Sequence, residues 1–136
     1  MSKGLRAATI GVALLAAQCT GARALDAARF TASLKSFSDA VGARFKATGR
    51  TYLDVTDLAT QYFDRDVPLV TYAELFKNAG FSRRDSWPPQ RRFTVFIKPV
   101  TCGRWFFNYC EIRIAFYHND REITSVRGHF FDMAII

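Results

Sequence analysis

Cys102 and Cys110 bracket a segment rich in aromatic side chains. The two cysteines could form a disulfide, and the aromatic rings could contact a partner. Cys19, the third cysteine, lies in an N-terminal stretch that we expect to be removed, which leaves an even number. An even count in an oxidising compartment favours a disulfide, and closing so short a ring contributes about 2.5 kcal/mol in the chain-entropy model. We therefore predict a Cys102–Cys110 cross-link. In the alternative register the second strand begins at Arg104, and the two cysteines do not face each other.

The segment between the cysteines concentrates four aromatic side chains and an arginine, namely Arg104, Trp105, Phe106, Phe107 and Tyr109. A connector of this size cannot cover all four rings. Either Trp105 and Phe107 fold back onto a sheet while Phe106 and Tyr109 point outward, or the whole group is a contact surface. Trp, Tyr and Arg are the residues most often found as interface anchors. We take these five residues as the predicted partner-binding site, with Arg104 as a charged rim, and keep burial in the core as the alternative.

The two histidines, His118 and His129, are the remaining candidates for chemistry. His118 is followed by Asp120, so His118 could act as a general base that the Asp120 carboxylate orients. However, no Ser or Cys nucleophile stands in a recognisable setting, and neither histidine has a second ligand at metal spacing. We expect no catalytic residue, no metal and no cofactor. A small hydrolase that uses His118 or His129 is the rival interpretation.

Residues 1–24 have the pattern of a cleaved export signal. Lys3 and Arg6 make the start positive, and residues 7–17 form an apolar centre. The small residues of Ala22-Arg23-Ala24 then provide a cleavage site. An apolar run of about 11 residues is too short for a membrane-spanning helix, which needs about 20. We expect the mature chain to begin at Leu25. Lipidation at Cys19 is the alternative, although Gln18 stands where a small residue is wanted.

Removal of the signal leaves 112 residues, 25–136, enough for a single α+β domain with one core. The net charge falls from +7 to about +4, because three basic residues and no acid are lost. A mild, scattered positive charge disfavours a nucleic-acid partner. These observations predict a periplasmic or secreted protein with no transmembrane segment in its mature chain.

Three helices are predicted in the first half of the mature chain. Residues 26–47 carry an apolar stripe at helical spacing, formed by Phe30, Leu34, Phe37, Val41 and Phe45. Asp54 can cap a shorter second helix. Thr71 and Glu74 have the spacing of a capping box, which predicts a third helix over 71–79 that Gly80 ends.

The second half of the chain changes to strand periodicity. From Ser82 a connector with Pro88 and Pro89 is expected, with a short Pro-rich recognition segment as the alternative. Alternation then predicts a strand from Phe93 that Pro99 ends or restricts to an edge and a strand from Cys110. The turn Asn119-Asp120 leads into a further strand over 122–133. The fold class is therefore α+β, with N-terminal helices packed on one face of an antiparallel meander of three, or four, strands.

Residues 54–133 resemble the SmpA/OmlA (BamE-like) family of small periplasmic proteins. Two segments have the family's sequence pattern, the helix opening Val67-Pro68-Leu69-Val70-Thr71-Tyr72-Ala73-Glu74-Leu75 and the strand, turn and strand of residues 112–123. The resemblance implies helices layered on an antiparallel sheet and a role in outer-membrane assembly.

We therefore expect an exported, non-enzymatic protein that binds another protein of the cell envelope, as an accessory factor in envelope assembly. The alternative is a periplasmic inhibitor or immunity protein that blocks a secreted hydrolase or toxin. Fold alone does not separate these functions.

Overall fold

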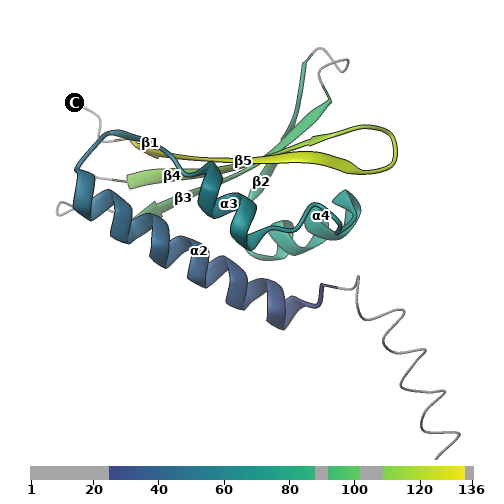
Figure 1. Ribbon diagram of the computed structural model, residues 1–136, viewed down its shortest axis with the longest axis horizontal. Coiled ribbons are helices and arrows are strands. Elements are labelled where there is room, and N and C mark those ends of the chain that lie inside the picture. Colours follow the sequence, from purple (N-terminus) through teal and green to yellow (C-terminus); the bar gives the residue numbers. More distant parts are fainter. Residues whose placement is uncertain (1–24, 88–91, 102–108, 134–136) are drawn as a thin grey trace, which may run out of the picture.

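The computed structural model describes residues 25–87, 92–101 and 109–133. The helices are α2 (Ala27–Thr48), α3 (Thr56–Tyr62) and α4 (Leu69–Asn78). The strands are β1 (Tyr52–Asp54), β2 (Ser82–Asp85), β3 (Phe93–Thr101), β4 (Tyr109–His118) and β5 (Ile123–Asp132). All strand pairs are antiparallel, and the sheet order is β1-β5-β4-β3-β2. The three helices lie on one side of this sheet (Figure 1), which confirms the α+β class.

Helix α2 follows the sequence prediction closely. Asp26 is its N-cap and accepts a hydrogen bond from the backbone N–H of Arg29 at 2.8 Å. Gly49 ends the helix with φ of 62°, a left-handed conformation that glycine adopts without steric cost. The predicted stripe faces the core through Phe30, Phe37 and Val41, all nearly fully buried.

Within the described residues the sheet has five strands, so the prediction of three or four was wrong. The two additional strands are the edges β1 and β2. Strand β1 has only three residues, and all four side chains of β2 are exposed. Neither segment has a run of alternating burial long enough to be recognised, and both form because their backbones hydrogen-bond to β5 and β3. The connector expected from Ser82 is therefore a strand as far as Asp85.

The starts of the two shorter helices also differ from prediction. No side chain caps α4, which begins at Leu69 with Pro68 as N-cap, so the Thr71–Glu74 capping box was wrong. Proline has a fixed φ that suits this position, and α4 begins two residues earlier than predicted. Asp54 lies in β1, and its carboxylate accepts a hydrogen bond from the Thr56 N–H at 3.0 Å. The predicted stop of α4 is confirmed at Gly80, which has φ of 90°.

Strand β3 continues through Pro99, where the sequence suggested an end or an edge. Pro99 pairs with Glu111 of β4, whereas β2 pairs only with residues 94–97 of β3. Pro99 therefore lies on a stretch of β3 that has one neighbour. Proline has no N–H to donate. It is tolerated at this position because no strand of the described residues lies beyond this edge to accept a hydrogen bond.

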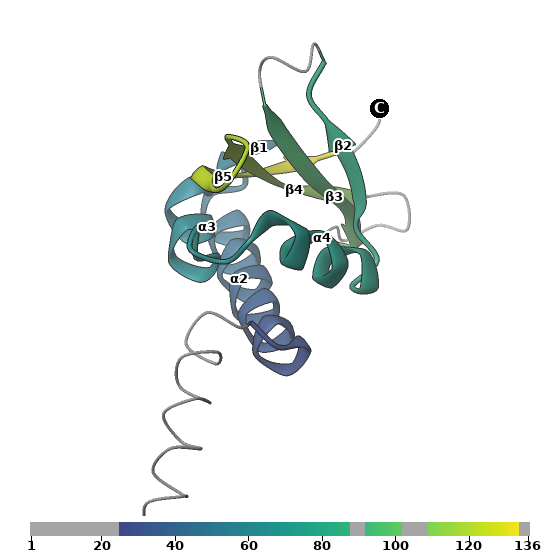
Figure 2. The same cartoon turned by 90° about the vertical axis from the view of Figure 1, so that its right-hand side faces the viewer.

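The core between the helices and the sheet is unusually aromatic. Phe76 of α4 lies at its centre, with six ring centroids between 4.6 and 5.9 Å away: Phe30, Phe63, Tyr72, Phe81, Phe96 and Phe116. Tyr72 donates its hydroxyl to the Asp64 carbonyl oxygen at 2.6 Å. Burial, assisted by the charge of Asp64, raises the pKa of Tyr72. Turning the molecule shows α4 under the β2–β3 side of the sheet and α2 running beside it (Figure 2).

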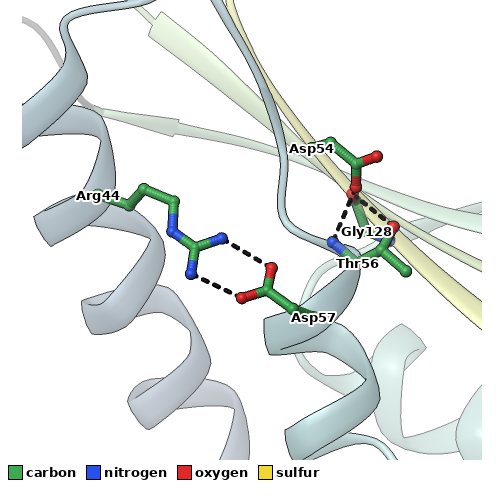
Figure 3. Close-up of polar contacts among 5 residues, drawn as sticks. All are labelled: Arg44, Asp54, Thr56, Asp57 and Gly128. Atoms are coloured by element: carbon green, nitrogen blue, oxygen red, sulfur yellow. Dashed lines mark hydrogen bonds and ion pairs between the residues drawn. The ribbon is translucent and has the colours of Figure 1, made fainter.

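A bidentate ion pair joins α2 to α3. The two terminal guanidinium nitrogens of Arg44, Nη1 and Nη2, each lie 2.7 Å from a carboxylate oxygen of Asp57. Figure 3 shows this pair. The hydrogen bonds from Arg44 hold the pKa of Asp57 below its ordinary value. Both side chains are substantially exposed, which limits the stability gained to less than about 1 kcal/mol.

Asp57→Asn should therefore lower the free energy of unfolding at neutral pH by several tenths of a kcal/mol, up to about 1 kcal/mol. A carboxyl whose folded-state pKa is depressed stabilises the fold above its unfolded pKa, and this contribution is lost as the pH falls through the folded pKa. The variant and the wild type should thus converge in acid. Urea unfolding at several pH values measures this, with Arg44→Gln and the double variant completing a coupling cycle. A difference that persists unchanged in acid would contradict the ion-pair explanation.

Candidate binding face of the sheet

The predicted aromatic site falls mostly outside the described residues. Arg104, Trp105, Phe106 and Phe107, together with Cys102, belong to 102–108. The backbone of Tyr109 pairs with Thr101 at the start of β4, and Cys110 pairs with Val100 and is fully buried. The disulfide and the role of the aromatic segment therefore stay predictions.

The two histidines lie in separate settings. His118 Nε2 is 3.1 Å from the Thr94 hydroxyl, which donates its proton to Asp85 at 2.8 Å. Since that hydroxyl has one proton, Thr94 accepts from His118. Burial raises the pKa of Asp85, but hydrogen bonds from Thr94 and Arg83 outweigh it and hold the pKa below its ordinary value. His129 Nδ1 lies 2.7 Å from the hydroxyl of Tyr52 on the opposite edge of the sheet.

Residues 25–87, 92–101 and 109–133 also bear on membrane-spanning and metal-binding features. Within these ranges no helix combines the length and the apolar character that crossing a membrane requires. The same residues contain no group of three or more His, Cys, Asp or Glu side chains placed to hold a metal ion.

The most distinctive surface of the described chain is the side of the sheet that faces away from the helices, which we call the open face. Because side chains alternate along a strand, each strand contributes every second residue to it. In β4 the helix-facing residues are Cys110, Ile112, Ile114 and Phe116, all nearly fully buried, as the sequence alternation predicted. The open-face residues of the same strand are Glu111, Arg113, Ala115 and Tyr117.

A shallow groove of about 440 Å³ crosses the open face. Its floor is formed by short or branched apolar side chains, Val95, Ile97 and Ala115. Aromatic rings rise on both sides of this floor. Phe93 and Tyr117 lie on one side, with ring centroids 5.4 Å apart, and Tyr52 and Phe131 lie on the other, 5.1 Å apart. Trp87 at the rim is 86% exposed.

Two arginines of the open face lie over these rings. The Arg113 guanidinium carbon is 4.6 Å from the centroid of Phe131, and that of Arg127 is 5.0 Å from the centroid of Tyr117. Cation–π contacts of this kind hold an arginine in place without neutralising its charge. The face is therefore apolar at its centre, with arginines standing around that centre.

The acids in and beside the groove are already engaged. Asp85, which lines it, accepts hydrogen bonds from Thr94 and Arg83. Glu111 Oε1 accepts a hydrogen bond from Arg113 Nε. Asp54 accepts from Thr56, and these hydrogen bonds hold the pKa of Asp54 below its ordinary value. Arg84 and Arg127 are exposed, and neither has a carboxylate partner among the described residues. Two cationic side chains thus remain for an external anion.

Another hollow, of about 820 Å³, lies between the α3–α4 loop and the β4–β5 turn. It is lined by loop residues of both charges, including Asp64, Arg65, Asp66, Arg121 and Glu122. Such a lining is typical of solvated loops. The open face is the better candidate, because it joins exposed aromatic rings to a net positive charge.

Sequence reasoning did not identify the open face as a site. The alternation in β4 did indicate one buried face and one mixed face, and Trp87 stood within a proline-rich stretch that was considered for recognition. The missing information was the order of the strands, which brings β2 and β5 onto the two sides of β3 and β4.

Comparisons with protein-family models, with curated proteins and with solved structures gave no match to this chain. The resemblance to the SmpA/OmlA family stays an expectation drawn from the residues.

Proposed function

We propose that this is an exported, non-enzymatic protein of the cell envelope that binds another protein through the open face of its sheet. The observations that support this are the groove with aromatic walls and the nearby Arg84 and Arg127, which have no carboxylate partner among the described residues. A soluble protein that exposes a contiguous aromatic surface commonly uses it as an interaction site.

The composition of the open face is that of an interface centre. Tyr, Trp, Phe and Arg are enriched at protein interfaces, where their large rigid side chains bury much area for little entropy loss. Here Trp87, Tyr52 and Arg84 are exposed around a floor of small apolar residues. Four rings of the face contact one another in pairs, Tyr52 with Phe131 and Phe93 with Tyr117, which restricts their positions before a partner arrives.

The export half of the proposal is supported by the sequence of residues 1–24. The aromatic segment that contains Phe106 joins β3 to β4, and in our proposal it adds to the partner surface. We further propose the Cys102–Cys110 cross-link as the closure of that segment.

Site-specific photocrosslinking tests the proposal in cells that make the full chain. A photoreactive phenylalanine analogue is placed at Ser125, which is exposed on the open face opposite Tyr117. The matched control places it at Ser36, which is exposed on α2. Position 106 tests the aromatic segment. We expect a protein adduct from position 125 and from position 106, and none from position 36.

The proposal is wrong if positions 125 and 106 give no adduct, or if position 36 gives the same adduct as they do. The identity of the captured protein separates the two kinds of partner. A component of an envelope-assembly machine would support an accessory role, whereas a hydrolase or toxin would indicate an inhibitor. The mass of the purified chain must also match a start at Leu25 without lipid.

A further inference from the structure

We propose that the open face binds an extended segment of its partner in which two acidic residues flank an apolar one, in the order acid, any residue, apolar, any residue, acid. This inference rests on the proposed function, and it specifies the chemistry of the partner. The segment lies across the strands, from β2 to β5.

One register row of the sheet sets the spacing. Arg84 pairs with Val95, Val95 with Ala115, and Ala115 with Arg127, so four residues from four adjacent strands stand in line. Neighbouring strands lie about 4.8 Å apart, which puts the backbones of Arg84 and Arg127 about 14 Å from each other. The two arginines thus stand at the ends of a straight row whose middle is apolar.

An extended peptide matches this row. Residues i, i+2 and i+4 of an extended chain point to the same side, and i and i+4 are about 13 Å apart. Acidic side chains at i and i+4 therefore reach Arg84 and Arg127 together. A guanidinium can hold a carboxylate through two parallel hydrogen bonds, which favours this pairing over a single point contact.

The middle of the row accommodates the apolar residue. Ala115 has the smallest side chain on the open face of β4, and it lies between Arg113 and Tyr117. The side chain at i+2 would enter above Ala115, with the Phe93 and Tyr117 rings on one side. Burial there removes apolar surface of both partners from water.

Charge selects the partner and disfavours a second copy of this chain. Glu111 is paired with Arg113 and Asp85 with Arg83, which leaves Arg84 and Arg127 against the single carboxylate of Asp54, so the net charge around the groove is positive. Two open faces stacked on each other would bring arginines against arginines. An acidic segment supplies the complementary charge.

Fluorescence anisotropy with two labelled peptides tests the proposal. The first, Ser-Glu-Thr-Phe-Thr-Glu-Ser, places both acids on the same side as Phe. The second, Ser-Thr-Glu-Phe-Glu-Thr-Ser, has the same composition and charge but places the acids on the opposite side. We expect the wild-type protein to bind the first peptide at least about fivefold more tightly, because only that peptide can engage both arginines at once.

Charge-matched variants then locate the binding site. The Arg84→Gln/Arg127→Gln variant should bind the first peptide at least about tenfold more weakly. The control, Arg29→Gln/Arg50→Gln, removes the same charge from exposed positions at α2 and at the turn after it. Its affinity should change less than about twofold. Melting curves check that all variants fold, and the single Arg84→Gln and Arg127→Gln variants replace the double one if it does not.

Equal affinity for the two peptides, or equal losses in the two double variants, would overturn the proposal, because a general attraction between opposite charges explains either result. If neither peptide binds while position 125 still captures a partner, the acidic pattern is wrong and the proposed function stands. If position 125 captures only a second copy and the protein sediments as a dimer, both proposals are wrong.

Discussion

Phe76→Ala is expected to lower the free energy of unfolding by about 3–5 kcal/mol, the range measured when a large buried aromatic side chain is removed. The Phe76 side chain is fully buried and contacts rings from every layer of the core. Its loss leaves a cavity that the surrounding rings cannot close, since three of them, Phe30, Phe96 and Phe116, are fixed on α2 and on the sheet. A domain of this size has a total stability of about 5–15 kcal/mol, so the loss is a large fraction of it.

Thermal unfolding followed by circular dichroism measures this effect, and the midpoint should fall by at least about 10 °C. Phe76→Leu should lose less, because it keeps part of the volume. Val70→Ala is the matched control on the same helix, where Val70 is 72% exposed and its change should cost less than about 0.5 kcal/mol. If Phe76→Ala melts as the Val70 control does, the ring is not part of a packed core.

Gly128→Val should destabilise the fold by about 1–3 kcal/mol or more, since overpacking forces neighbours to move. A Cβ added at Gly128 would lie 2.9 Å from the Ala59 Cβ and 3.1 Å from the Val55 carbonyl oxygen. At this point β5 passes directly beneath the start of α3. Val55 donates its N–H to the Gly128 carbonyl oxygen at 2.9 Å, and the Gly128 N–H donates to the Thr56 hydroxyl oxygen at 3.2 Å. Figure 3 shows this junction beside the Arg44–Asp57 pair.

Gly42 provides the control for this substitution. A Cβ at Gly42 meets nothing within 4 Å, and the residue lies inside α2. Gly42→Ala should therefore raise stability by about 0.5–1 kcal/mol through helix propensity, while Gly128→Ala lowers it. Urea unfolding of the three variants gives the comparison. Equal and positive effects of alanine at both positions would show that the close approach of α3 to β5 does not limit the fold.

Local periodicity was enough to predict the elements that bury one face against the core. Helix α2 was predicted to within one residue at each end, because its apolar stripe is a local signal and its two caps, Asp26 and Gly49, directly flank it. Strand β4 was predicted because a strand with one buried face must alternate, and β5 was predicted from the Asn119-Asp120 turn that precedes it. The start of α4 was missed, because Thr71 and Glu74 fit a capping pattern that this helix does not use. The helix begins two residues earlier, with Pro68 as its N-cap.

Only the tertiary structure decided which segments complete the sheet and what the open face contains. Strands β1 and β2 have too few residues or too little burial for a sequence pattern, and they exist because β5 and β3 offer free backbone edges. The sequence determined that Arg84 and Arg127 are present and charged. Their position in one row, on either side of Val95 and Ala115, follows from strand order and register, which depend on contacts between residues far apart in the chain.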